Sequence, residues 1–403
     1  MHYFLILGRN PTLSIAEIAA QVANQQFRIT KVSPEILILE SDTEIDAKIW
    51  QKKLGGVIKI GKIAIEDDKF NVDTIVQLLP KIFSKIYFGF SIYQIKPGLN
   101  MRGLKTQIKN LAMDVKKELK KLNIASRWVV SKEDKLSSVV LQKNKLLEKG
   151  KEFIFLINGD KLLLGETLTC QAFEEYSFYD YARPQRPIEQ GMLPPKLAKI
   201  MINLSQAPLN GKILDPFCGS GTILQEAARL GLPDIIGTDI SAAAIDNTKL
   251  NLKWLAENYQ LPNTKYQIFQ SDVREVSKKI APYSIDAIVT EPYLGPLTIR
   301  NLKLEIENLS KLYLSAFQEF KKILKPEGRI VIIFPVFKIG TEQHFLPILD
   351  EIKKIGWQII NPIPENLRNH PTIKLTSRQS IIYSRPDQKV LREIFIFKKD
   401  DKT

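Results

Sequence analysis

The stretch ILDPFCGSGTILQEAA, residues 213–228, determines which fold we expect for the second half of this 403-residue chain. A short apolar run ends in Asp215, the chain then turns through Gly219 and Gly221, and a helical pattern follows over 220–230. Glycines let a backbone approach a ligand closely, and a helix N-terminus attracts an electron-rich group. A strand, a glycine turn and a helix in this order predict an α/β sheet with a ligand site where its first strand ends.

The residues of the loop restrict which ligand fits there. The chain contains no GxxxxGK[ST] phosphate loop, and Leu224 stands where a dinucleotide-binding loop has its third glycine. Asp215, four residues before Gly219, would repel a pyrophosphate but suits the cationic amino-acid end of S-adenosylmethionine. Cys218 has no histidine near it in the sequence and is interpreted as a small loop residue. The residues of this stretch predicted to bind the cofactor are Asp215, Phe217, Gly219, Gly221 and Thr222.

Two further acidic residues follow later strands. Asp239 ends a strand expected over 235–239, where a carboxylate can accept hydrogen bonds from ribose hydroxyls. Asp272 follows a strand near 266–269 and is placed to accept from the adenine amino group. A single Asp after a strand is more often a helix cap, but three in this order favour a cofactor site. Ile240 and Val273, which follow these two acids, complete the predicted cofactor-binding set.

A fourth motif, VTEPYLGP at 289–296, ends the next predicted strand. Methylation of an exocyclic base amine needs a hydrogen-bond acceptor for the N–H group and an aromatic ring to stack on the extruded base. It depends mainly on positioning the amine against the methyl donor. Glu291 is the candidate acceptor, Tyr293 the candidate stacking ring, and Pro292 joins them in the predicted catalytic set. The alternative is a proline-containing turn without chemistry.

Strands and helices alternate through the rest of the second half. Strands are expected near 285–290 and 328–337, and helices over 241–257 and 302–324. This alternation predicts a doubly wound α/β sheet. Before it, residues 176–195 carry four prolines and four aromatic residues, which favour an extended linker.

The first half reads as a separate α+β module that ends in a hairpin, FIFLINGDKLLLGETL. Between Lys81 and Lys151 there are 17 Lys and Arg against 5 Asp and Glu, which accounts for 12 of the 14 net positive charges. One predicted helix there has an apolar stripe of Leu104, Ile108, Leu111, Val115, Leu119 and Leu122. Its other face carries Lys105, Lys109, Lys116 and Lys120, which are predicted to contact a phosphate backbone. A localised basic surface indicates a polyanionic partner, although a solvated lysine-rich face is the alternative.

The composition excludes several classes of protein. A hydrophobic fraction of 44% is typical of globular chains, and no apolar run is long enough for a membrane span. The N-terminus reads as a strand rather than a signal peptide. Two cysteines and three scattered histidines provide neither a disulfide framework nor a zinc site, so we expect no metal and a cytoplasmic location.

Several motifs together resemble a known family. DPFCGSGT, Asp239, Asp272 and the strand-end EPY resemble the amino-methyltransferases with a Rossmann-like fold. LGRNPTLSIAEI (7–18), the basic module and the LLLGETL hairpin are similar to the THUMP-containing tRNA guanine N2-methyltransferases, above all the archaeal and eukaryotic family acting on guanosine 10. DYARPQRPIEQGMLPPKLAKIMINL (180–204) matches the linker and first methyltransferase helix of that family. The resemblance covers nearly the whole chain.

The resemblance implies four regions: a ferredoxin-like domain (1–66), a THUMP-like RNA-binding domain (67–172), a linker (173–195) and a Rossmann-like methyltransferase domain (196–403). It also implies that S-adenosylmethionine is the cofactor and tRNA the partner. The family usually has Asp-Pro-Pro-Tyr where an ungapped alignment gives Glu291, Pro292, Tyr293 and Leu294. Sliding the alignment to match the tyrosine would make Thr290 the acceptor instead.

Three functions are therefore open at the level of the sequence. The first is a tRNA guanine N2-methyltransferase that adds one or two methyl groups at position 10. The second is the same chemistry on another tRNA or ribosomal RNA guanine, or on a DNA adenine. The third is a non-catalytic RNA-binding protein with a degenerate methyltransferase fold, for which the altered EPYL motif is the argument. The sequence does not require an activating partner subunit and is silent on the oligomeric state.

Overall fold

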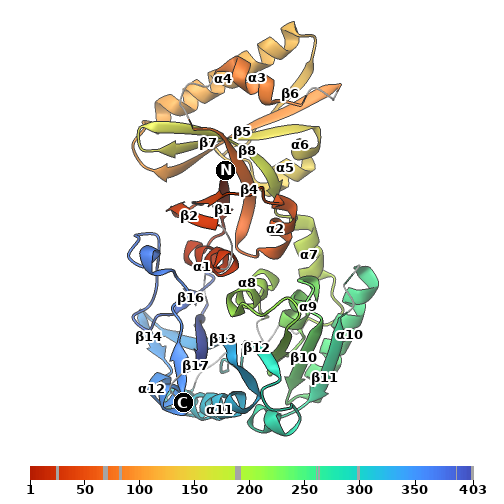
Figure 1. Ribbon diagram of the computed structural model, residues 1–403, viewed down its shortest axis with the longest axis vertical. Helices are drawn as coiled ribbons and strands as arrows, with labels where there is room; N and C mark the ends of the chain where they lie inside the picture. The colour runs from red at the N-terminus through yellow and green to blue at the C-terminus, as the bar shows by residue number, and fades with distance from the viewer. Residues whose placement is uncertain are drawn as a thin grey trace. The chain divides into compact units, whose positions relative to one another are not determined.

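The computed structural model describes residues 1–23, 27–66, 71–80, 84–186, 192–259, 261, 264–296, 300–386 and 388–400. The chain divides into two compact units, Met1–Ile15 with Val22–Glu175 and Ala16–Gln21 with Tyr176–Thr403. Each unit is built on its own β-sheet (Figure 1). We call them the first and the second unit.

The described part of the first unit contains an eight-stranded sheet in the order β2-β3-β1-β4-β8-β7-β5-β6. Its strands are β1 (His2–Leu7), β2 (Phe27–Val32), β3 (Ile36–Ser41), β4 (Val57–Ile65), β5 (Lys85–Lys96), β6 (Ala125–Val129), β7 (Gly150–Asn158) and β8 (Lys161–Cys170). The helices that begin in this half of the chain are α1 (Pro11–Val22), α2 (Ala47–Lys53), α3 (Val72–Leu78), α4 (Met101–Lys121), α5 (Ser138–Lys143) and α6 (Leu146–Lys149).

A single sheet runs through the two regions that the resemblance separates at residue 66. β4 pairs antiparallel with β1 on one side and with β8 on the other. β8 in turn forms the predicted hairpin with β7, and its turn contains Gly159 at φ +67°, a conformation that favours glycine. The expected boundary therefore falls between strands of one continuous sheet.

Helix α4 forms where the apolar stripe predicts it. Asn100 caps its N-terminus by accepting a hydrogen bond from the Arg102 backbone N–H at 3.0 Å. Its buried side chains face the aromatic residues of β5 and β7, and α3 and α4 lie together over that part of the sheet (Figure 1). Leu122, predicted to belong to the stripe, is 52% exposed because the helix ends at Lys121.

Two elements differ from the sequence interpretation. β2 was not expected because it is an edge strand whose side chains alternate between exposed and half-buried, so its apolar signal is weak. The segment expected to be an extended linker begins with a helix, α7 (Phe173–Tyr181). Residues 187–191 of the expected linker lie outside the described residues. The helix is stabilised by ring contacts: Phe178 stacks on Trp254 with centroids 5.4 Å apart, and Tyr179 lies 4.3 Å from Tyr259.

The second unit has the predicted doubly wound sheet. Its strand order is β11-β10-β9-β12-β13-β17-β15, with β14 paired to β13 and β16 to β17. The strands are β9 (Lys212–Asp215), β10 (Asp234–Asp239), β11 (Lys265–Gln270), β12 (Ile285–Thr290), β13 (Leu324–Ile339), β14 (Glu342–Phe345), β15 (Trp357–Ile359), β16 (Ile381–Tyr383) and β17 (Val390–Lys399). The helices are α8 (Pro195–Ser205), α9 (Thr222–Arg229), α10 (Ala242–Asn258), α11 (Leu302–Ile323) and α12 (Leu349–Ile355), with 3₁₀ turns η2 (Val273–Lys278) and η3 (Glu365–Leu367).

Strand direction in this sheet places loops with chemical side chains at one edge. β9, β10, β11, β12 and β13 run parallel, whereas β17 is antiparallel to β13. Parallel strands bring their carboxyl ends to the same edge, where α/β sheets bind their ligands. Helices cover both faces of the sheet, with α11 and α12 on the side opposite α8 and α9 (Figure 1).

An aromatic core fixes α11 to the sheet. Phe317 on α11 lies 5.0 Å from Phe397 on β17, and Tyr313 lies 5.2 Å from Phe334 on β13, both edge to face. All four side chains are almost fully buried. Among the described residues, no helix is long and apolar enough to span a membrane, and no group of three or more His, Cys, Asp or Glu is suited to a metal ion.

Candidate functional site

The glycine loop lies between β9 and α9, at the carboxyl edge of the second sheet. Gly219 and Gly221 have φ values of +52° and +82°, which favour glycine. A Cβ added to Gly221 would lie 3.0 Å from the Thr248 side chain, whereas one added to Gly219 would meet no atom within 4 Å. Gly221 is therefore required for packing, and the space beside Gly219 is open to a ligand.

Hydrogen bonds from β10 and α10 hold the loop in place. The Gly219 N–H donates to Asp239 Oδ2 at 3.0 Å, and Thr248 Oγ1 donates to the Gly219 carbonyl at 2.8 Å. Asn251 Nδ2 donates to the Ser220 carbonyl at 2.9 Å. Because its backbone groups are paired in this way, the loop is a preorganised surface.

Asp215 is buried at the end of β9. Its Oδ1 accepts from Thr290 Oγ1 at 2.7 Å and from the Phe217 N–H at 3.2 Å. Burial raises the pKa of Asp215 to about 7, and the nearby Asp239 and Glu291 carboxylates act in the same direction, against the lowering effect of these two hydrogen bonds. The Asp215 carboxyl therefore changes between its protonated and ionised forms near neutral pH.

Thr290, the alternative acceptor, lies against the glycine-loop strand. Its side chain is fully buried at the end of β12, and its hydroxyl proton is directed to Asp215. The Thr290 hydroxyl is thus engaged at Asp215, whereas the Glu291 side chain keeps 14% of its surface exposed.

Asp239 and Asp272 lie at neighbouring strand ends. Asp239 Oδ1 accepts from the Ser241 N–H at 2.9 Å, while its Oδ2 holds Gly219. The Ser271 N–H donates to the Asp239 carbonyl at 2.9 Å, which ties the ends of β10 and β11 together. The two acids thus share one edge with the glycine loop, as the sequence predicts.

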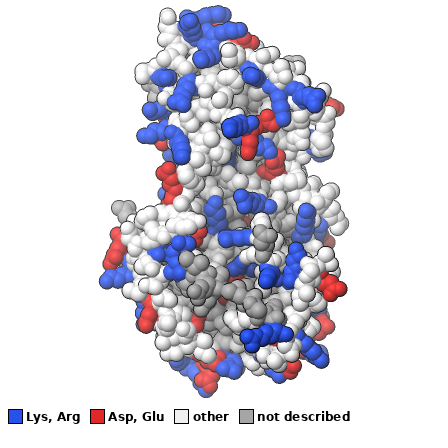
Figure 2. Space-filling model, turned by 180° about the vertical axis from the view of Figure 1, so that it is seen from behind, with Lys and Arg blue, Asp and Glu red and all other residues white. Residues whose placement is uncertain are grey.

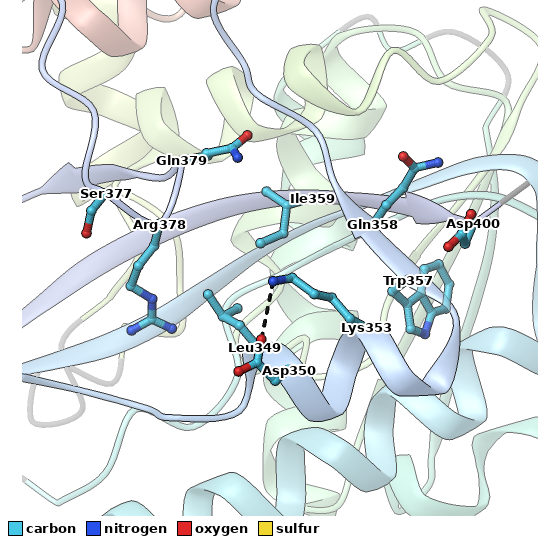
Figure 3. Close-up of a pocket in the computed structure, with 10 residues that line it drawn as sticks. All are labelled: Leu349, Asp350, Lys353, Trp357, Gln358, Ile359, Ser377, Arg378, Gln379 and Asp400. Carbon is cyan, nitrogen blue, oxygen red and sulfur yellow. Dashed lines mark hydrogen bonds and ion pairs between the residues drawn. The ribbon is translucent and has the colours of Figure 1, made fainter.

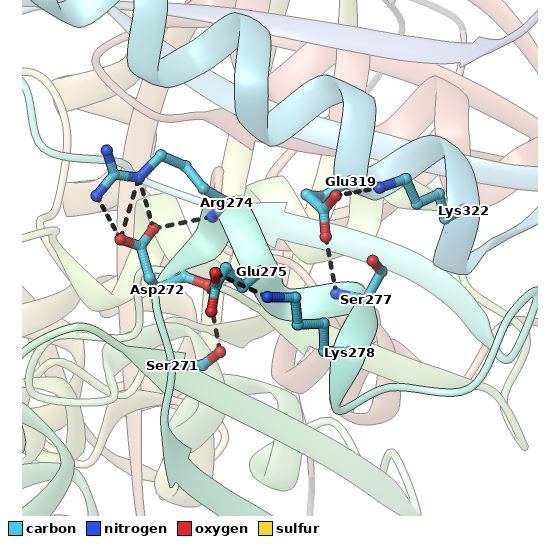
Figure 4. Close-up of polar contacts among 8 residues, drawn as sticks. All are labelled: Ser271, Asp272, Arg274, Glu275, Ser277, Lys278, Glu319 and Lys322. Carbon is cyan, nitrogen blue, oxygen red and sulfur yellow. Dashed lines mark hydrogen bonds and ion pairs between the residues drawn. The ribbon is translucent and has the colours of Figure 1, made fainter.

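Asp272 is engaged by a neighbour that the sequence analysis did not consider (Figure 4). It caps η2 through the Arg274 N–H at 2.9 Å, and the Arg274 guanidinium contacts both carboxylate oxygens. This hydrogen bonding lowers the pKa of Asp272 below its usual value. The carboxylate is thus ionised and oriented, and it is also the helix cap that a single Asp after a strand most often forms.

The remaining predicted cofactor residues have different environments. Ile240 is 63% exposed beside Asp239, so its side chain is available to a ligand. Val273 is 3% exposed and packs in the core, which leaves only its backbone available. Phe217 is half-buried against the same core. Thr222 is buried, and its Oγ1 accepts from an Arg183 guanidinium N–H at 2.8 Å.

The EPY motif follows β12 directly. Pro292 is buried, Tyr293 is 55% exposed, and the Tyr293 carbonyl accepts from the hydroxyl of Tyr313 on α11 at 3.0 Å. Glu291 is mostly buried, and its Oε1 accepts from Arg392 Nε on β17 at 2.5 Å. The backbone of the motif is thus anchored while the tyrosine ring faces solvent.

Two arginines at this edge were missed by the sequence analysis. Arg183 lies in the segment interpreted as a linker, and Arg392 lies on the last described strand. Arg183 is recoverable only from the resemblance of 180–204. No local pattern marks Arg392, since its partner Glu291 is 101 residues away in the sequence.

The predicted RNA-binding lysines lie on α4 in the first unit. All four are exposed, and Lys105 forms an ion pair with Asp134 at 2.5 Å. Among the residues that the structure describes, Lys109, Lys116 and Lys120 have no ion-pair partner. On the face of the first unit shown in Figure 2, Lys and Arg side chains gather at the end that carries α3 and α4.

A cavity of about 530 Å³ lies elsewhere in the second unit, beside α12 and β15 (Figure 3). Its wall includes Trp357, Arg378 and an ion pair between Lys353 and Asp350 at 3.3 Å. None of the predicted cofactor or catalytic residues is among the described residues that line it. It does not belong to the site at the carboxyl edge of the sheet.

The sequence and the fold of the chain are similar to those of known proteins. Residues 183–340 match the family model of the RMKL-like methyltransferase domain. A solved structure, TrmN from Thermus thermophilus, superposes with a TM-score of 0.53 over 99% of this chain and all of that one, at 14% identity, which is a likeness of fold. Together with the sheet order and the glycine loop, these matches define the second unit as a Rossmann-like methyltransferase domain.

Proteins with similar sequences identify the family within the methyltransferases to which the chain belongs. A probable tRNA (guanine(10)-N2)-dimethyltransferase of Methanothermococcus thermolithotrophicus is 33% identical over 139 residues, which are 34% of this chain and 77% of that one. The tRNA (guanine(10)-N2)-dimethyltransferase of Methanothermobacter thermautotrophicus is 37% identical over 142 residues, 35% of this chain and 38% of that one. The chain belongs to the tRNA (guanine(10)-N2)-dimethyltransferase family. Its matches to three of the relatives span only 38% to 57% of the lengths of those relatives.

Proposed function

We propose that this chain is an S-adenosylmethionine-dependent methyltransferase that adds one or two methyl groups to N2 of guanosine 10 in tRNA. The observation that carries the proposal is that the glycine loop after β9 and the EPY motif after β12 lie next to each other at one edge of the sheet. Asp215, at the end of β9, and Thr290, the residue before Glu291, are joined by a hydrogen bond of 2.7 Å. The cofactor loop and the base acceptor are therefore adjacent. Family membership supports the choice of guanine in tRNA.

The residues at this edge fit S-adenosylmethionine. The cofactor presents a cationic amino group, two ribose hydroxyls and an adenine amino group, all of them donors. Asp215, Asp239 and Asp272 are acceptors in the matching order, and the position beside Gly219 is open. We assign the amino group to Asp215, the ribose to Asp239 and the adenine to Asp272, with Ile240 packing against the adenine.

The residues of the chain then have simple roles. When bound, S-adenosylmethionine supplies an electrophilic methyl group. Glu291 accepts a hydrogen bond from the guanine N2 amine and receives the proton that this nitrogen loses. The exposed ring of Tyr293 stacks on the base, and buried Pro292 keeps the turn rigid. The contribution of the protein is mainly orientation and electrostatic stabilisation.

The first unit supplies the RNA-binding surface in this proposal. Its α4 lysines and the resemblance to THUMP-containing enzymes support that role. The proposal includes a ferredoxin-like part (1–66) and a THUMP-like part (67–172), which both contribute strands to one sheet.

The direct test is methyl transfer to an unmodified tRNA transcript. The purified 403-residue chain is incubated with S-adenosylmethionine carrying a labelled methyl group, and the nucleosides of the product are separated. Label in N2-methylguanosine or its dimethyl form supports the reaction, and a transcript with adenosine at position 10 should accept none. Label elsewhere would move the target to another base. Absence of label on any RNA, with cofactor binding shown separately, would favour a non-catalytic RNA-binding role.

Replacing Asp239 by Ala should weaken cofactor binding by about tenfold, because a carboxylate acceptor for the ribose is lost. The Gly219 N–H loses its partner in the same variant, so the loop also becomes less ordered. Calorimetric titration with S-adenosylhomocysteine measures the effect, and filter binding of tRNA is the control, since the variant leaves the first unit unchanged. An unaltered cofactor affinity would refute the ribose assignment.

Replacing Lys109, Lys116 and Lys120 together by Ala should weaken tRNA binding and reduce the slope of log K against log salt by roughly 2 to 3, because each phosphate contact contributes about 0.7 to 0.9. Lys117 and Lys121 on the same helix pair with Asp114 and Glu118, so a double Ala variant of these two is the matched control. A slope equal to that of the unaltered chain would assign the three lysines to solvation alone.

A further inference from the structure

The Glu291–Arg392 contact joins the catalytic motif to a strand two positions away in the sheet. β13 lies between β12 and β17, so Arg392 reaches over β13 to meet Glu291. In the register of β17, Arg392 lies opposite Pro335 of β13 and Tyr383 of β16, which places it beyond the end of β12. The side chains of Glu291 and Arg392 are only 14% and 6% exposed.

This reach accounts for the glutamate at position 291. Adjacent strands lie about 4.8 Å apart, so two side chains separated by an intervening strand must span roughly 10 Å. A glutamate extends one methylene further than an aspartate, and here it meets the Nε of the long arginine side chain at 2.5 Å. The combined length of the Glu291 and Arg392 side chains is therefore suited to this separation.

The electrostatic surroundings of Glu291 explain why a cation is needed. Burial raises the pKa of Glu291 above its usual value, and Arg392 acts against this through its charge and its hydrogen bond. Asp215 on β9 is a nearby acid, and burial together with the Glu291 charge raises the pKa of the Tyr313 phenol on α11. Among the described residues, Arg392 is the positively charged group that lowers the pKa of the Glu291 carboxyl.

We propose that Arg392 is a positioning residue that fixes the orientation and the negative charge of the Glu291 carboxylate for the base amine. The inference rests on the proposed methyltransferase function. One carboxylate oxygen is held by Arg392, and in the part of the chain that the structure describes the second oxygen can accept from the amine. A buried carboxylate without this partner would take up a proton, and the neutral acid is a weaker acceptor that cannot receive the proton lost by the amine.

The experiment compares Arg392→Met, which removes the charge at similar length, with Arg392→Lys, which keeps it. Methyl transfer to tRNA is measured from pH 5.5 to 8.5 for both variants and for the unaltered chain. We expect Arg392→Met to lower kcat about 10- to 100-fold, to change KM for tRNA little, and to move the acidic limb of kcat upward by about one pH unit or more. Arg392→Lys should restore part of the rate and move the limb back.

Two further measurements separate positioning from general damage. S-adenosylhomocysteine affinity should be unchanged in Arg392→Met, because the contact that the variant removes is the one with Glu291, which is not among the assigned cofactor residues. In a Glu291→Gln background, Arg392→Met should cause little additional loss, since both changes remove the same interaction. Lys389→Met is the matched control, an exposed cation lost from the same segment, and should leave rate and pH profile as they are.

The possible failures are distinguishable. An acidic limb that stays in place, or losses from Arg392→Met and Glu291→Gln that simply add, would overturn the positioning role while the methyltransferase activity stands. Absence of methyl transfer by the unaltered chain would instead overturn the proposed function. If Arg392→Met does not fold, the pH profile of Arg392→Lys and its combination with Glu291→Gln decide the question.

Discussion

Asp215→Asn should stabilise the free protein at pH 8 and weaken its cofactor binding at the same time. Burial raises the pKa of Asp215 from 3.8 to about 7, so the native state favours the protonated acid more than the unfolded chain does. The resulting stability is fully present below about pH 4 and is lost as the pH rises to about 7. Asn is neutral at every pH and keeps an oxygen for Thr290 and Phe217. The expected gain at pH 8 is roughly 2 to 4 kcal/mol in the free energy of unfolding.

The same substitution removes the charge that we assign to the cofactor amino group. We expect the affinity for S-adenosylhomocysteine to fall about 10- to 100-fold at pH 8. In the unaltered chain, affinity should rise between pH 6 and pH 8 as Asp215 loses its proton. Chemical denaturation and calorimetry at pH 5 and pH 8 measure both effects, and Asp350→Asn, at an exposed ion pair on α12, is the control. Equal affinity of the variant and the unaltered chain at both pH values would contradict the assignment.

Glu291→Gln should reduce methyl transfer roughly 10²- to 10³-fold with cofactor affinity within twofold of normal. The amide keeps the size of the side chain and an oxygen for Arg392, but it cannot take the proton from the base amine. Single-turnover methylation of tRNA and calorimetry with S-adenosylhomocysteine measure the two quantities. Glu307→Gln, which breaks an exposed ion pair on α11, serves as the control.

Thr290→Val separates the two alignments of the EPY motif. Its hydroxyl donates to Asp215, so the variant should weaken cofactor binding more than it slows the chemical step. Normal turnover in Glu291→Gln together with a large loss of kcat in Thr290→Val would transfer the acceptor role to Thr290.

The sequence predicted the parts of the site that depend on local chain geometry. The glycine turn, the acids that end β10 and precede η2, and the motif after β12 are each readable because strand, turn and helix signals lie within a few residues of each other. Their convergence followed from one rule, the common edge of parallel strands, and the sheet order confirmed the predicted fold class.

Contacts between distant segments were not predictable from the sequence. The pairing of Glu291 with Arg392 and of Asp215 with Thr290 depends on the order of the strands in the sheet, and no local pattern encodes it. The guanidinium that orients Asp272 is only two residues away, but an Arg after an Asp is too common to interpret. α7 was missed because its aromatic residues are stabilised by packing on α10 rather than by helical periodicity.

The pairing of β4 with β8, which joins the two halves of the first sheet, has a consequence while the ribosome synthesises the chain. The ribosome completes β4 at Ile65 and β8 only at Cys170, roughly a hundred residues later, which at about 5 to 20 residues per second leaves one edge of β4 unpaired for about 5 to 20 s. An uncovered strand edge readily pairs with other chains. A nascent fragment ending near residue 66 therefore carries an unpaired strand edge that is open to association with other chains until β8 covers it.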